Sequence, residues 1–113
     1  MATKLVEAIS RFLAECPYVI SLYDLMTKTR LELEKGYFLD LYYNETCSKY
    51  SYTLIRKNKR IVGWDNAPHH PDLTNYPHHF HAENRTVQPS TFIGDPKSDI
   101  VEVIKTINDI LSR

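Results

Sequence analysis

The chain has few glycines and cysteines and no long apolar run. Its three glycines, Gly36, Gly63 and Gly94, lie far apart, which excludes a glycine-rich phosphate-binding loop. Its two cysteines, Cys16 and Cys47, form no CxxC pair and no zinc-binding spacing. No apolar run approaches the ~20 residues of a membrane span, and the N-terminus lacks the unbroken apolar segment of a signal peptide. We therefore expect a cytoplasmic protein in a reducing setting, with no membrane partner.

The chain also has no net charge, because 14 basic residues balance 14 acidic ones among 113 residues. This balance differs from the strongly basic composition of a dedicated DNA-binding protein. The charges are unevenly placed, since residues 1–60 are mildly basic and residues 61–113 mildly acidic. The densest basic run, residues 56–60, permits transient contact with a polyanion. The length predicts one domain, residues 1–113.

Hydrophobic periodicity predicts a helix at each end of the chain. Near the N-terminus the apolar residues recur at helical spacing and form one stripe that faces a core: Leu5, Ala8, Ile9, Phe12 and Leu13. Pro17 ends this helix. Near the C-terminus, Asp95 and Pro96 have the order of an N-cap and a first helical residue, and an isoleucine-rich stripe follows them.

Between the helices the pattern predicts short strands joined by tight turns. We expect strands near residues 29–34, 37–43, 50–55 and 61–64, with a further edge strand near 78–82. Residues 17–28 are ambiguous between helix and strand. Sequential short strands favour an antiparallel meander. The predicted fold class is therefore α+β, a β-meander of four to five strands flanked by N- and C-terminal helices.

All five histidines lie within thirteen residues: His69, His70, His78, His79 and His81. Imidazole can act as a general acid or base near neutral pH, and the neutral ring can bind a metal. On an extended segment the rings of His79 and His81 would share one face of the sheet. The cluster is thus typical of a proton-transfer site, in which His70 is a further candidate, or of a metal site.

The metal interpretation uses His69, His70, His79 and His81, with a divalent ion such as zinc as cofactor. No sequence signature such as HExxH accompanies these residues. A purely structural role for several of the histidines also remains open. The proton-transfer interpretation requires no cofactor.

Four further residues are candidates for roles beside the histidines. Asp65 and Asn66 follow the strand expected at 61–64. Asp65 could orient a histidine, and Asn66 could bind a phosphate. Alternatively, the two residues could simply form a turn. Tyr52 and Arg56 lie on the preceding expected strand, where Arg56 could bind a phosphate and Tyr52 could stack on a base. Packing is the alternative role for the tyrosine.

These segments resemble the TumE-type toxins of bacterial and archaeal toxin–antitoxin systems. The resemblance rests on residues 49–52, 61–66, 67–71 and 77–81, supported by residues 31–40 and 87–90, and it covers about residues 29–111. It implies a small toxin whose partner is a cognate antitoxin protein. The family pattern falls on Asp65, Asn66, His79 and His81, with Tyr52 and Arg56 as weaker matches. The N-terminal helix lies outside the motif, so it could cover the sheet or bind a partner.

Three hypotheses about function follow. In the first, the protein is a metal-independent endoribonuclease in which His79, His81, Asp65 and His70 are catalytic and Arg56, Tyr52, Asn66 and His69 bind the RNA substrate. In the second, the histidine cluster binds a metal, either in a metal-dependent hydrolase or in a metal-binding module. In the third, the histidine loop binds a partner without catalysis. The sequence also leaves open a homodimer.

Overall fold

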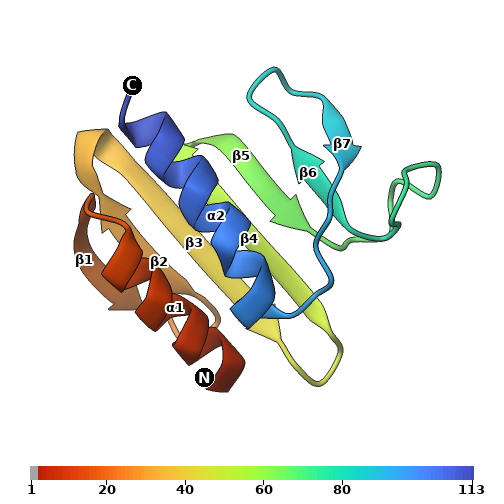
Figure 1. Ribbon diagram of the computed structural model, residues 1–113, viewed down its shortest axis with the longest axis horizontal. Helices are drawn as coiled ribbons and strands as arrows, with labels where there is room; N and C mark the ends of the chain where they lie inside the picture. Colours follow the sequence, from red (N-terminus) through yellow and green to blue (C-terminus); the bar gives the residue numbers. More distant parts are fainter. Residues whose placement is uncertain (1–2) are drawn as a thin grey trace.

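The computed structural model describes residues 3–113, and Figure 1 shows two helices lying against one face of a single sheet. A short 3₁₀ turn, η1, occupies Glu34–Gly36. The helices and strands follow one another in this order: α1 (Thr3–Glu15), β1 (Val19–Asp24), β2 (Thr29–Leu33), β3 (Tyr37–Asn44), β4 (Lys49–Arg56), β5 (Lys59–Asp65), β6 (His79–His81), β7 (Val87–Pro89) and α2 (Pro96–Leu111).

The sheet is an antiparallel meander in which every strand pairs with its neighbours in sequence, in the order β1 to β7. The α+β class and the flanking helices are confirmed, but the expected number of strands is wrong, because the sheet has seven. The sequence did not predict β1, whose edge position leaves most of its side chains exposed, so that no buried alternation marks it. It also did not predict β7, which has three residues and ends at Pro89.

Helix α1 covers the sheet through the apolar stripe that the sequence predicts, with one exception. Leu5, Ala8, Ile9 and Phe12 are buried, whereas Leu13 is 42% exposed and does not belong to the core. The buried stripe continues instead to Cys16, one helical turn after Phe12, whose carbonyl accepts the Cys16 N–H at 2.9 Å.

Helix α2 begins as expected, with Asp95 accepting a hydrogen bond from Lys97 N at 3.1 Å and Pro96 in the first turn. It runs parallel to α1 on the same face of the sheet (Figure 1). The side chain of Lys97 meets Glu7 at 2.9 Å, and Asn108 Nδ2 donates to Glu15 O at 3.0 Å. The two helices therefore form one layer over the sheet.

Strand alternation divides the sheet into a helix-covered face and a face turned away from the helices, here called the open face. In β4, Tyr50, Tyr52 and Leu54 are buried towards the helices, while Ser51 and Thr53 alternate with them. Strand register then carries two rows across the open face: Ser51, Asp65 and His79 in one, Thr53, Gly63 and His81 in the next. Three of the predicted site residues, Asp65, His79 and His81, therefore meet on the open face.

Within residues 3–113, neither helix is long and apolar enough to cross a membrane.

Candidate active site

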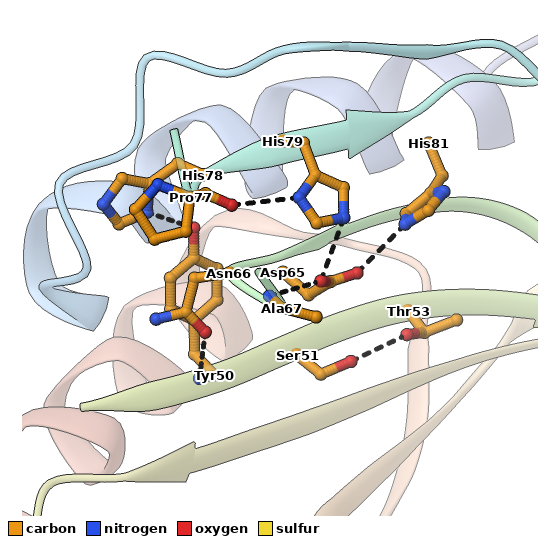
Figure 2. A network of polar contacts seen from close by, with 10 residues as sticks. All are labelled: Tyr50, Ser51, Thr53, Asp65, Asn66, Ala67, Pro77, His78, His79 and His81. Carbon is orange, nitrogen blue, oxygen red and sulfur yellow. Dashed lines mark hydrogen bonds and ion pairs between the residues drawn. The ribbon is translucent and has the colours of Figure 1, made fainter. Parts of the chain in front are cut away.

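One carboxylate joins the two histidines of β6 (Figure 2). Asp65 Oδ1 lies 3.0 Å from His79 Nε2, and Asp65 Oδ2 lies 3.0 Å from His81 Nε2. The pairing of β5 with β6 places Asp65 directly opposite His79, and the two-residue spacing brings His81 to the same face. We call this group the Asp65–His79–His81 triad.

His79 is the inner member of the triad, with only 2% of its surface exposed. Its Nδ1 lies 3.0 Å from Pro77 O, and its Nε2 faces Asp65. Both ring nitrogens therefore face protein oxygen atoms. His79 is therefore enclosed, and its Nε2 lies against the Asp65 carboxylate.

His81 is the outer member of the triad and is partly exposed. Burial lowers the pKa of His81 below its ordinary value, and the nearby charge of Arg60 lowers it further, against the hydrogen bond to Asp65, which raises it. The ring is therefore mainly neutral at neutral pH. A neutral ring that donates Nε2–H to Asp65 leaves Nδ1 as a proton acceptor.

His70 lies beside the triad, although it comes from the loop between β5 and β6. Its ring centroid is 4.8 Å from that of His79 and 6.4 Å from that of His81. Together His70 and His81 line a hollow of about 580 Å³. The other polar side chains of this hollow are all cationic: Lys59, Arg60 and Arg85. We call it the cationic hollow.

Asp65 itself lines a second hollow, of about 460 Å³. Its lining includes aromatic residues and one lysine: Tyr42, Tyr50, His69 and Lys49. We call it the aromatic hollow. The predicted binding residue His69 thus lines one hollow, while its neighbour His70 lines the other.

Asn66 also lines the aromatic hollow, but its amide is already engaged. Asn66 Oδ1 accepts from Tyr50 N at 3.1 Å, and Asn66 Nδ2 donates to Ser48 O at 2.6 Å. Asp65 Oδ1 in addition accepts from Ala67 N at 2.9 Å. The two residues therefore build the turn that leaves β5, as the alternative interpretation expected, and Asp65 orients the histidines as well.

His78 has a structural partner outside the triad. Its Nδ1 lies 2.7 Å from Tyr50 Oη (Figure 2). Burial raises the pKa of Tyr50, with the charges of Asp99 and Asp65 acting in the same direction, and burial lowers the pKa of His78. Both groups are therefore neutral near pH 7, and the tyrosine hydroxyl donates to the imidazole. This bond ties the start of β6 to β4.

Two predicted binding residues lie away from the site. Tyr52 is 1% exposed and packs in the core beside Tyr50, on the helix-covered face. Arg56 lies at the far end of β4, about 16 Å along the strand from Ser51. Its Nε donates to Lys35 O at 3.1 Å, and its guanidinium lies over the ring of Tyr37. Tyr52 is thus enclosed and Arg56 lies far from the histidines, and their predicted role in binding a substrate stays a prediction.

The group of residues that could bind a metal in the structure differs from the group expected from the sequence. Among residues 3–113, the group with suitable spacing comprises Asp65, His79 and His81, whose ligand atoms lie within 4.8 Å of one another. His69 and His70 are not part of this group. The geometry thus suits two uses, proton transfer and metal coordination by two imidazoles and a carboxylate.

The sequence predicted only part of the cationic hollow. Lys59 and Arg60 belong to the basic run 56–60, which was expected to permit transient contact with a polyanion, whereas Arg85 carried no signal. Gly63 explains the position of Arg60, because a Cβ at Gly63 would lie only 3.2 Å from Arg60 Cδ. The missing side chain thus leaves room for the arginine stem beside the row that holds His81.

The fold and site define a small α+β protein with a histidine–carboxylate cluster on the open face of its sheet. The chain matches the family described as Toxin TumE over residues 5–111, so it belongs to the TumE toxin family. The resemblance seen in the motifs is confirmed, and the match extends to α1, which the motifs did not include. No curated protein and no solved structure matches the chain.

Proposed function

We propose that this toxin cleaves RNA by general acid–base catalysis in the cationic hollow. The observation that supports the proposal is the meeting of two imidazoles, His70 and His81, in one hollow with three cationic side chains. A carboxylate fixes one of the two rings at 3.0 Å. Paired imidazoles beside cations suit a reaction in which a proton leaves one oxygen of a phosphodiester and another is added opposite.

In the proposed reaction, His81 Nδ1 removes the proton of a ribose 2′-hydroxyl. The 2′-oxygen attacks phosphorus, and the bond from phosphorus to the 5′-oxygen breaks, which leaves a 2′,3′-cyclic phosphate. Protonated His70 donates its proton to the departing 5′-oxygen. Asp65 holds His81 through Nε2, and His79 is a positioning residue that holds Asp65.

This assignment modifies the expectation that His79 and His81 form the acid–base pair. Only His81 of that pair lines the hollow, whereas His70 from the preceding loop lines it too. The revised pair is therefore His70 and His81, with His79 acting through Asp65.

The direct test is RNA cleavage by the full chain in excess EDTA. Proton transfer between histidines needs no metal, so we expect the cleavage rate to be the same with and without the chelator. The assay uses a labelled RNA and, in parallel, the same sequence as DNA, which has no 2′-hydroxyl and should stay intact. Loss of RNA cleavage in EDTA would contradict the metal-independent mechanism.

A second candidate function is metal-dependent hydrolysis. It is favoured by one observation, the convergence of Asp65, His79 and His81 within 4.8 Å. A cleavage rate that EDTA abolishes and added zinc restores would select this candidate. If neither condition yields cleavage of RNA, the non-enzymatic interaction module becomes the better proposal.

The pH dependence of cleavage provides a further prediction. The base His81 must be deprotonated, and its pKa lies below the ordinary value of 6.5. We therefore expect the acid limb of kcat/KM to have its midpoint below pH 6.5. Arg60→Gln should move this midpoint upward, because the charge of Arg60 lowers the pKa of His81. Lys105→Gln, which removes a charge on α2, should leave it unchanged.

Membership of a toxin family also suggests a protein that neutralises the toxin. We propose a cognate antitoxin as partner and the cytoplasm, where RNA is accessible, as the place of action. Co-expression with the neighbouring gene product, followed by copurification, tests this partner.

A further inference from the structure

We propose that the substrate is single-stranded RNA bound across both hollows, with backbone phosphates in the cationic hollow and one unstacked base in the aromatic hollow. This inference rests on the proposed function, because it takes the Asp65–His81 pair as the place of the scissile phosphate. It adds which side chains bind the strand on each side of that phosphate.

The cationic hollow has the charge that a phosphodiester backbone requires. Within residues 3–113, the structure shows no ion pair for the side chains of Lys59, Arg60 and Arg85. Other cations of the protein do have acidic partners; Arg113, for example, pairs with Glu83 at 2.9 Å. Three unpaired cations around one hollow repel one another, and an anionic ligand relieves that repulsion. Two or three phosphates of a strand supply the matching charge.

The turn between β6 and β7 places Arg85 in this group. Arg85 has a left-handed backbone, with φ of 68°, and its N–H donates to Ala82 O at 3.0 Å. Because β6 ends at His81 and the turn starts directly after it, the arginine is held close to the catalytic imidazole. The hairpin therefore fixes a cation beside the proposed reaction centre.

The aromatic hollow has the features of a nucleoside site. Tyr42, His69 and Lys49 are among the residues that line it. Aromatic rings stack on bases of any sequence, and a neighbouring cation favours the attached phosphate. Its volume of about 460 Å³ exceeds what one base requires and falls within the usual range of small-ligand sites.

The two hollows meet at the triad. Asp65 lines the aromatic hollow and His81 lines the cationic hollow, and these two residues are hydrogen bonded at 3.0 Å. A phosphodiester next to His81 therefore has one neighbouring nucleotide at the aromatic hollow and the rest of the strand at the cationic hollow. A base can enter the aromatic hollow only after it leaves its stack, which a duplex opposes. This is why we infer a single strand.

The test measures binding separately from cleavage. The probe is a fluorescent 2′-O-methyl RNA octamer of mixed sequence, which lacks the 2′-hydroxyl nucleophile and so resists the proposed reaction. Its dissociation constant for the full-length protein is measured by fluorescence anisotropy over a range of salt concentrations. The two subsites are tested with two double variants, Lys59→Ala with Arg85→Ala, and Tyr42→Ala with His69→Ala.

The two variants should differ in their salt dependence. Loss of Lys59 and Arg85 should raise Kd about tenfold or more and reduce the slope of log Kd against log salt by about 1.4, since each contact to a single strand contributes about 0.7. Loss of Tyr42 and His69 should raise Kd about tenfold with the slope unchanged, because stacking involves no ion release. The control, Lys4→Ala with Lys105→Ala, removes two exposed cations of the helices and should bind like the wild type.

Three results would overturn the inference. In the first, either double variant binds the octamer as tightly as the control variant does. In the second, the wild type binds a blunt duplex of the same sequence as tightly as the single strand, and in the third it does not bind the octamer at low salt. The proposed function fails by a different result. If the wild type binds the octamer as described but does not cleave the corresponding unmodified RNA, the binding inference stands and the catalytic proposal is wrong. Circular dichroism confirms that each variant is folded.

Discussion

His81→Ala should lower the rate of RNA cleavage by about 10²–10⁴-fold, the usual contribution of one general acid or base. The effect should be large because His81 both lines the cationic hollow and is held by Asp65 at 3.0 Å. Single-turnover cleavage of a labelled RNA in EDTA measures the rate of the chemical step. His70→Ala should cause a loss of similar size, and the double variant should lose little more than either single variant, since the two rings act as a unit.

A histidine outside the mechanism is the matched control for this experiment. His78 belongs to the same cluster but bonds to Tyr50 at 2.7 Å and does not line the cationic hollow. His78→Asn, which keeps a polar group near the tyrosine hydroxyl, should retain the wild-type rate. Full activity of His81→Ala would contradict the proposed mechanism, and equal losses in His81→Ala and His78→Asn would point to a structural effect.

Phe12→Ala should destabilise the protein by about 3–5 kcal/mol, the usual cost of removing a large aromatic side chain from a core. Phe12 is fully buried, at 0% exposure, between α1 and the sheet. The neighbouring Leu13→Ala is the control, and it should cost less than about 1 kcal/mol because Leu13 is 42% exposed. Urea unfolding followed by circular dichroism measures both values.

This comparison decides the role of the N-terminal helix, for which the sequence left two interpretations. A large loss for Phe12→Ala and a small one for Leu13→Ala would mean that α1 stabilises the sheet through its buried stripe. Equal small losses would mean that α1 contributes little to folding and is free for another role. The buried contacts of Leu5, Ile9 and Phe12 favour the first result.

Local patterns predicted most of the fold because each depends on residues a few positions apart. The helical spacing of Leu5, Ile9 and Phe12 identified α1, and Asp95 followed by Pro96 marked the start of α2. Alternating residues identified β2 to β5. The edge strands β1 and β7 were not predicted from the sequence. An edge strand pairs with one neighbour and buries few side chains, so apolar and polar residues alternate only weakly along it.

The sequence predicted that site residues lie close together where they belong to one strand or follow the end of a neighbouring strand. His79 and His81 share a face through the period of two, and Asp65 follows the adjacent strand, so their proximity could be expected. The difference between the two histidines, one buried and one partly exposed, could not be expected from the sequence. Which histidine is buried depends on the loop between β5 and β6, which brings His70 within 4.8 Å of the His79 ring.

The sequence by itself determined the α+β class, the antiparallel order of strands, the helix start at Asp95 and the family to which the chain belongs. These follow from short-range periodicity, turn chemistry and motifs that are read along the chain. Only the tertiary structure decided that Tyr52 is enclosed and Arg56 distant, and that Arg60 and Arg85 flank His81. The reason is that strand register, the space above Gly63 and the path of the loop bring together residues that are distant in the sequence, such as Lys59 and Arg85, which are 26 positions apart. No local pattern encodes such contacts.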